Sequence, residues 1–87
     1  MEVAVYDTYV SKKDGSVMHF DILVSDEAAS KEQVYQFGRQ YLATKGQEGQ
    51  SLAAKECRFC HIEEPTQEVV DAINAQGYYI IEMQGCQ

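Results

Sequence analysis

Two strand-like runs joined by a turn sequence open the chain and constrain its fold most. Residues 2–10 and 17–24 are rich in residues that favour strands, and the segment between them contains Asp14-Gly15, a pair typical of turns. Side chains alternate between the two faces of a strand, so the second run has one apolar face and one mixed face. The apolar face holds Met18, Phe20, Ile22 and Val24. We therefore predict a β-hairpin with one face turned toward the core.

Two helices and two more strands are predicted after the hairpin. Ser30 to Gln33 has the spacing of a capping box, which predicts a helix that runs to about Lys45. Residues 54–63 favour a third strand, and Thr66 and Gly77 are suited to cap the two ends of a second helix. Residues 78–83 favour a fourth strand. The predicted buried positions of the helices are Val34, Phe37, Gly38, Tyr41, Leu42, Val69, Val70 and Ile73.

The order β-β-α-β-α-β predicts the fold class. With 87 residues, the chain has room for one domain and one modest core, so we expect a single α+β domain over residues 1–87. Helices and sheets of this size pack as layers. We expect a two-layer sandwich, with one small mixed sheet and both helices packed on one face of it.

The charge balance excludes some partners. The chain has 14 Asp and Glu against 7 Lys and Arg, and its basic residues are scattered rather than clustered. Binding to a phosphate backbone needs clustered cations, so we expect neither nucleic acid nor an anionic membrane as a partner. The first seven residues lack the pattern of a secretory signal, and no apolar run approaches the roughly 20 residues of a membrane span. We expect a cytoplasmic protein with its three cysteines reduced.

The string Cys57-Arg58-Phe59-Cys60-His61 is the one motif here with several chemical interpretations. Covalent haem attachment uses both thiols and the histidine of C-x-x-C-H. The missing export signal and the strand-like context argue against haem. A thiol redox pair is a second interpretation, since Arg58 or His61 would favour a thiolate. Neighbouring acidic side chains oppose that effect; they are Glu56, Glu63 and Glu64.

Zinc is a third interpretation, and its ligands would be Cys57, Cys60, His61 and Cys86, with His19 as a further donor. In an extended strand Cys57 and Cys60 point to opposite faces, so a shared ion requires a turn at Arg58-Phe59. Neither residue is a turn former. We therefore expect no cofactor, with zinc as the alternative, and small structural roles for both cysteines.

A polar cluster is predicted from the alternation of the first two strands. Asp7, His19 and Asp21 share a parity that places them on one face if the strands are neighbours, and His61 would join them if the third strand lies alongside. An imidazole beside carboxylates can move protons or bind a cation. Solvated polar groups on an open sheet surface are the alternative.

Four strings together resemble a small bacterial family of uncharacterised proteins, classed as a domain of unknown function. They are Val5-Tyr6-Asp7-Thr8-Tyr9-Val10, residues 18–24 (M-H-F-D-I-L-V), residues 57–63 (C-R-F-C-H-I-E) and the tail from Gly77-Tyr78 to Gly85-Cys86. The resemblance implies a compact α+β fold and a soluble bacterial protein. It implies no activity, substrate or cofactor, so no functional residues carry over from it.

Two hypotheses of function follow. The first is a non-enzymatic module that binds a protein or small ligand, or a second copy of itself, through a strand edge or a tyrosine-bearing face. The second is a zinc or thiol redox site built on Cys57, Cys60 and His61. Stoichiometric zinc or a reactive thiol would favour the second hypothesis.

Overall fold

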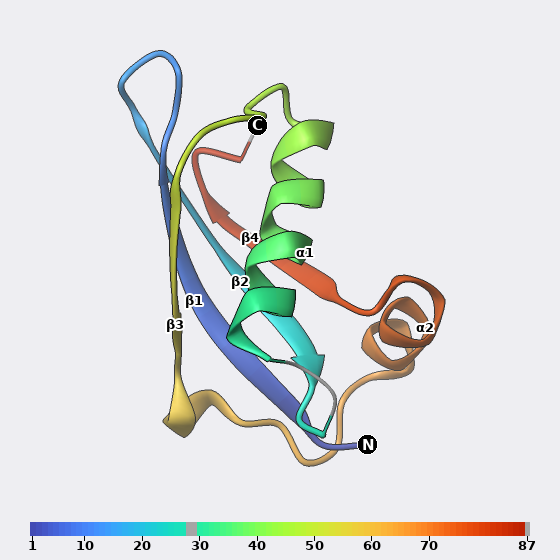
Figure 1. Ribbon diagram of the computed structural model, residues 1–87. Helices are drawn as coiled ribbons and strands as arrows, with labels where there is room; N and C mark the ends of the chain where they lie inside the picture. The colour runs from blue at the N-terminus through green and yellow to red at the C-terminus, as the bar shows by residue number, and fades with distance from the viewer. Residues whose placement is uncertain (28–29, 87) are drawn as a thin grey trace.

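The computed structural model describes residues 1–27 and 30–86, so residues 28, 29 and 87 of the predicted domain lie outside the described part. The predicted α+β class and the order β-β-α-β-α-β are confirmed (Figure 1). The elements are β1 (Val3–Ser11), β2 (Val17–Ser25), α1 (Lys31–Thr44), β3 (Leu52–Glu56), the short 3-10 helix η1 (Arg58–Cys60), α2 (Gln67–Gln76) and β4 (Tyr79–Gln84).

The four strands form one sheet in the order β3-β1-β2-β4. The predicted hairpin is confirmed, with Val10 opposite Met18 near the turn and Val3 opposite Ser25 at the far end. Every neighbouring pair is antiparallel, so the predicted mixed sheet is wrong. The hairpin occupies the centre, and β3 and β4 each return from a helix to pair with its outer edges. Both central strands are therefore held on two sides, whereas β3 and β4 are edge strands.

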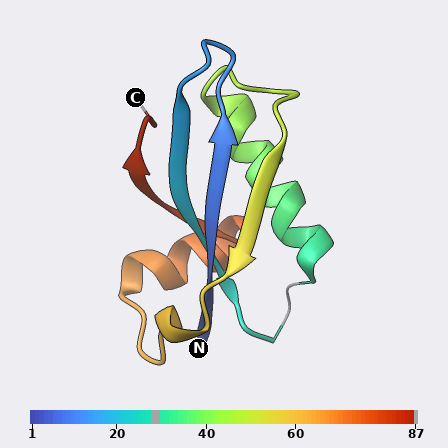
Figure 2. The same cartoon turned by 90° about the vertical axis from the view of Figure 1, so that its left-hand side faces the viewer.

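The helices cover opposite faces of the sheet, so the prediction that both pack on one face is wrong. Ala4 belongs to the core beside α1, whereas its neighbours Val3 and Val5 belong to a second core with Val69 and Ile73 of α2. Adjacent strand residues point to opposite faces, so the two cores lie on opposite sides of the sheet. Figure 2 shows α1 on the right of the twisted sheet and α2 at its lower left.

The first core is the larger one and contains the predicted apolar face of β2. Its buried members are Ala4, Val10, Met18, Phe20, Ile22, Val24, Val34, Tyr41, Leu42, Ala54, Tyr78 and Cys86. The second core holds Val3, Val5, Leu23, Val69 and Ile73. On the second face of β1 and β2, the buried apolar residues thus lie at the end that α2 covers.

Both helices begin and end as the sequence predicts. The Ser30 hydroxyl accepts a hydrogen bond from the Gln33 backbone N–H at 3.2 Å, and the Thr66 hydroxyl accepts one from Val69 at 3.4 Å. These contacts satisfy backbone donors that the first helical turn leaves free. Gly77 ends α2 in the left-handed conformation, with φ of 98°. Among the described residues, no helix is long and apolar enough to cross a membrane.

The helix α2 leaves uncovered the part of the second face that lies toward the turn between β1 and β2. Met18 faces the first core and Glu82 contacts α1, so their neighbours in the strands face the other way. Four exposed apolar side chains lie on this surface, which we call the open face: Tyr9, Val17, Ile81 and Met83. The polar residues Asp7, His19 and Asp21 lie on the same face between them.

Candidate functional site

The Cys57–Cys60 segment is a turn that protrudes from the edge of the sheet, and not the continuous strand predicted over residues 54–63. Cys57 still pairs with β1, since its N–H donates to the carbonyl of Val5 at 2.8 Å. Ile62 and Val3 then each donate a backbone hydrogen bond to the other's carbonyl oxygen. One residue of β1 lies between Val3 and Val5, but four residues lie between Cys57 and Ile62. The additional residues are forced out of the ladder and form η1.

This turn brings the two sulfurs together, and they form a disulfide across a Cα–Cα distance of 5.2 Å. The cysteines were expected to be reduced and to point apart, so both expectations are wrong for this structure. Alternation of side chains applies only to extended backbone, and the 3-10 turn at Arg58–Cys60 removes it. Arg58 and Phe59 are not turn formers by sequence. They adopt the 3-10 turn because both ends of the segment are fixed to β1.

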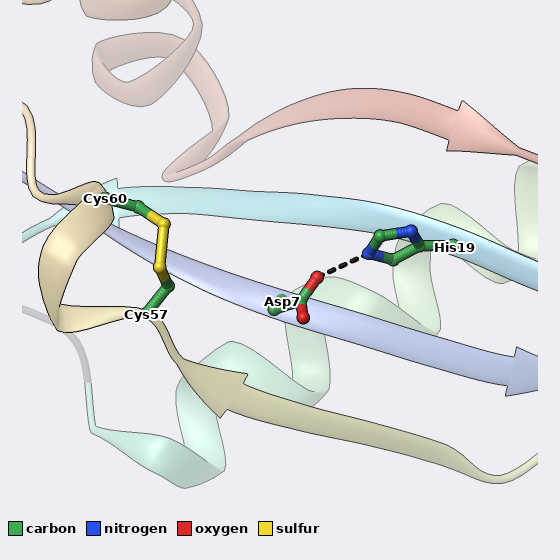
Figure 3. The surroundings of a disulfide bond; sticks show 4 residues. All are labelled: Asp7, His19, Cys57 and Cys60. Carbon is green, nitrogen blue, oxygen red and sulfur yellow. Dashed lines mark hydrogen bonds and ion pairs between the residues drawn. A yellow bond between two sulfur atoms is a disulfide. The ribbon is translucent and has the colours of Figure 1, made fainter.

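The disulfide is accessible from solvent. Cys60 is exposed and Cys57 is half-buried, and the ring of Phe59 between them is fully exposed. An open hollow beside the pair is lined by Lys55, Glu56, Cys57, Arg58 and Phe59. Figure 3 shows that the sulfurs lie on the same side of the sheet as Asp7 and His19, with α1 behind.

The four predicted zinc ligands are not brought together. Cys57 and Cys60 use their sulfurs in the disulfide, whereas Cys86 is buried at the opposite end of the sheet. The Cys86 thiol donates to the carbonyl oxygens of His19 and Gln84, each at 3.4 Å. His61 is instead grouped with two carboxylates. Its Nε2 lies 3.5 Å from a carboxylate oxygen of Glu2, and Asp26 completes a small exposed group with them.

The structure brings Asp7, His19 and Asp21 together at the middle of the open face. Asp7 and Asp21 are directly opposite each other on the two central strands. The Nε2 atom of His19 is hydrogen-bonded to Oδ1 of Asp7 (Figure 3). One ligand atom from each of the three residues lies within 4.8 Å of the others. His61, which sequence reasoning placed with them, lies elsewhere.

Burial and charge act on this cluster together. Burial raises the pKa of the Asp21 carboxyl above its usual value, and the charge of Asp7 raises it further, while His19 opposes the shift. The ring of His19 stacks on Tyr9 with a centroid distance of 4.2 Å and an angle of 5° between the rings. The imidazole orientation is therefore fixed by packing as well as by Asp7.

Sequence reasoning missed Lys55 and Phe59. Lys55 is opposite Asp7 in the register of β3 with β1, and it shares the strand face of Cys57. The two-residue spacing of Lys55 and Cys57 could have indicated that placement. No sequence signal indicated that Phe59 is exposed, since a phenylalanine in a strand-like run is usually buried.

Comparisons with known proteins agree with the fold but supply no activity. The family model described as "Domain of unknown function (DUF2024)" matches residues 1–83. The NMR structure of protein NE1680 from Nitrosomonas europaea is similar to this chain, with a TM-score of 0.80 and 38% sequence identity over 100% of both chains. The comparison with curated proteins gives no match. The chain therefore belongs to the DUF2024 family of domains of unknown function.

Proposed function

We propose that the protein is a thiol–disulfide exchange module in which Cys57 and Cys60 form the redox pair. The observation that supports this is a C-x-x-C disulfide closed within an exposed turn, with one of its sulfurs on an exposed residue. Structural disulfides in small proteins usually connect segments that are distant in sequence. This one links residues three positions apart, in a turn whose two ends are already fixed by hydrogen bonds to β1.

The exchange begins at Cys60, the more exposed cysteine of the pair. A partner thiolate attacks Sγ of Cys60, the bond between the two protein sulfurs breaks, and Cys57 leaves as a thiolate. A second partner thiolate then attacks the partner sulfur of the mixed disulfide and releases the Cys60 thiolate. Two electrons pass to the protein, and the partner is oxidised to its own disulfide.

Charges near the pair act in both directions on the thiolates. Lys55 shares the strand face of Cys57, and Arg58 follows it directly, so both cations favour the thiolate form. Glu56 and Glu63 oppose them. In many C-x-x-C proteins the dipole of a longer helix lowers the pKa of the thiol. The 3-10 helix η1 is too short to supply such a dipole. We therefore propose a redox-responsive pair rather than a fast oxidoreductase.

A thiol count tests this proposal. The protein is equilibrated in glutathione buffers of graded ratio, its free thiols are alkylated in acid-quenched samples, and the alkyl groups are counted by mass spectrometry. We expect a single two-electron step between one free thiol, that of Cys86, and three. Cys57→Ser and Cys60→Ser should show no such step, and Phe59→Ala should keep it. Three free thiols at every ratio, or a disulfide that resists every ratio, would contradict the proposal.

A second candidate function is an interaction module that pairs with another copy of the same chain through the open face. Four exposed apolar side chains gather there beside β4, an edge strand with unpaired backbone groups. Sedimentation over a range of concentrations tests it. A dimer that dissociates in Ile81→Lys supports this candidate, and a monomer at every concentration excludes it.

A further inference from the structure

We propose that Asp7, His19 and Asp21 form a binding site for one divalent transition-metal ion such as Zn²⁺. The site uses none of the cysteines and does not depend on the redox proposal. Two ligands that each lie about 2.0–2.2 Å from zinc are at most about 4.4 Å apart. The three candidate ligand atoms already lie within 4.8 Å of one another, so small side-chain rotations suffice to close on an ion.

The donor set matches such an ion. An imidazole nitrogen and two carboxylate oxygens bind zinc and related first-row metals, whereas calcium and magnesium prefer oxygen ligands alone. Three protein ligands leave at least one coordination position for water. The side chains of His19 and Asp7 are 19% and 43% exposed, so the cluster is held in the sheet and remains open to an ion from solvent.

The backbone that carries these residues is among the most constrained in the molecule. Asp7 and Asp21 face each other on β1 and β2, which are both paired on two sides. The ring of His19 is held against Tyr9, and its carbonyl accepts the hydrogen bond from Cys86. The pairing of β2 with β4 shifts between His19 and Phe20, an irregularity that often redirects side chains beside a functional site.

The carboxylates of Asp7 and Asp21 face each other, and a bound cation would reduce the repulsion between them. Like charges directly opposite each other across strands destabilise a sheet. Within residues 1–27 and 30–86, neither Asp7 nor Asp21 has an ion pair with a Lys or Arg side chain, and the imidazole of His19 is the basic group that contacts Asp7. Lys55 lies opposite Asp7 in the register, but the two form no ion pair in the described structure. A bound divalent ion would neutralise both carboxylates at once.

Metal titration tests the site. Zn²⁺ binding is measured by calorimetry on the Cys57→Ser/Cys60→Ser double variant, which removes the thiols that reduction of the disulfide would release as competing ligands. We expect one equivalent to bind and its affinity to fall by at least about tenfold in His19→Ala and in Asp21→Asn made in the same background. Co²⁺ should give visible absorption bands without the intense near-ultraviolet transition of a thiolate ligand.

The group of Glu2, Asp26 and His61 supplies the matched control, because it is a second combination of two carboxylates and one imidazole. His61→Ala should leave the affinity unchanged. A loss of binding in His61→Ala, unchanged binding in His19→Ala, or no saturable binding at all would overturn the proposal. Mn²⁺ broadening of amide resonances in the wild-type protein locates the ion without any substitution. We expect broadening centred on residues 7, 19 and 21, and broadening centred elsewhere would also overturn it.

Discussion

The ring of Phe37 in α1 lies directly against Gly77, the residue that ends α2 on the opposite face of the sheet. A Cβ atom placed on Gly77 would lie 2.7 Å from Cζ of Phe37, and the same ring stacks on Tyr78 at a centroid distance of 4.9 Å. Gly77 also has a φ of 98°, a conformation that other residues adopt at a cost. The crossing from α2 to β4 therefore depends on glycine for two separate reasons.

Gly77→Ala should destabilise the protein by about 2–4 kcal/mol, from about 1 kcal/mol of backbone strain and the remainder from the clash with Phe37. Gly46→Ala is the matched control, since Gly46 has a φ of 70° and nothing lies within 4 Å of an added Cβ. It should cost only the backbone term. Urea denaturation of both variants measures the difference, and equal losses would show that the contact with Phe37 is unimportant.

Reduction of the Cys57–Cys60 disulfide should cost little stability. The bond closes a loop of only a few residues, and the chain entropy of so short a loop corresponds to about 2 kcal/mol at most. The fixed ends of the turn should hold η1 in place even without the bond. Thermal melting with and without reductant checks this.

The Cys57→Ser/Cys60→Ser variant is the control for that measurement. Its melting temperature should equal that of the reduced wild-type protein and should not respond to reductant. Complete unfolding of either form at 25 °C would mean that the disulfide is essential for the fold, which would weaken the case for a reversible redox pair.

Local signals predicted the elements well, because caps and alternation act within a few residues. Ser30, Thr66 and Gly77 occupy the predicted cap positions, and the alternating face of β2 is buried as expected. The prediction that both helices cover one face was wrong. The face that each helix covers depends on Val3, Val5 and Leu23, which give the second face an apolar end, and on a sheet order that no local pattern contains.

The two candidate sites also differ in how far local sequence predicts them. The parity that groups Asp7, His19 and Asp21 is a property of neighbouring strands, so a hairpin was enough to indicate it. The disulfide depends on Ile62 returning to pair with Val3, a contact between segments almost sixty residues apart, counted from the sequence numbers. Nothing in the C-x-x-C string distinguishes a straight strand from a turn that is closed from both ends.

Phe59 and Phe20 give a direct comparison of one residue type in two environments. Phe20 is fully buried beside Tyr41, whereas Phe59 is fully exposed at the tip of η1. Phe20→Ala should lose about 3–5 kcal/mol, and Phe59→Ala should change stability by no more than about 0.5 kcal/mol. Equilibrium denaturation measures both. A large loss in Phe59→Ala would show that its ring packs against the protein in solution.

The pH dependence of the free energy of unfolding should show how much the charge of Asp21 destabilises the folded state. Burial and the charge of Asp7 raise its pKa in the folded state above the unfolded value, so ionisation of Asp21 disfavours the native state at neutral pH. As the pH falls through the raised pKa, the folded form takes up the proton first and this cost disappears. In metal-free buffer, Asp21→Asn should therefore raise the free energy of unfolding at pH 7, by about 0.2–1 kcal/mol given partial solvent screening, and leave it unchanged near pH 3.

Asp14→Asn is the control with the opposite sign. Hydrogen bonds from the Ser16 hydroxyl and backbone N–H, at 2.6 and 2.9 Å, lower the pKa of the Asp14 carboxyl. Its charged form favours the native state above the unfolded pKa, and that contribution is lost as the pH falls through the lowered value. Asp14→Asn should therefore reduce stability at pH 7, where Asp21→Asn increases it. Urea denaturation at pH 7 and pH 3 compares them, and a loss of stability in Asp21→Asn at pH 7 without metal would contradict the expected cost of the Asp21 charge.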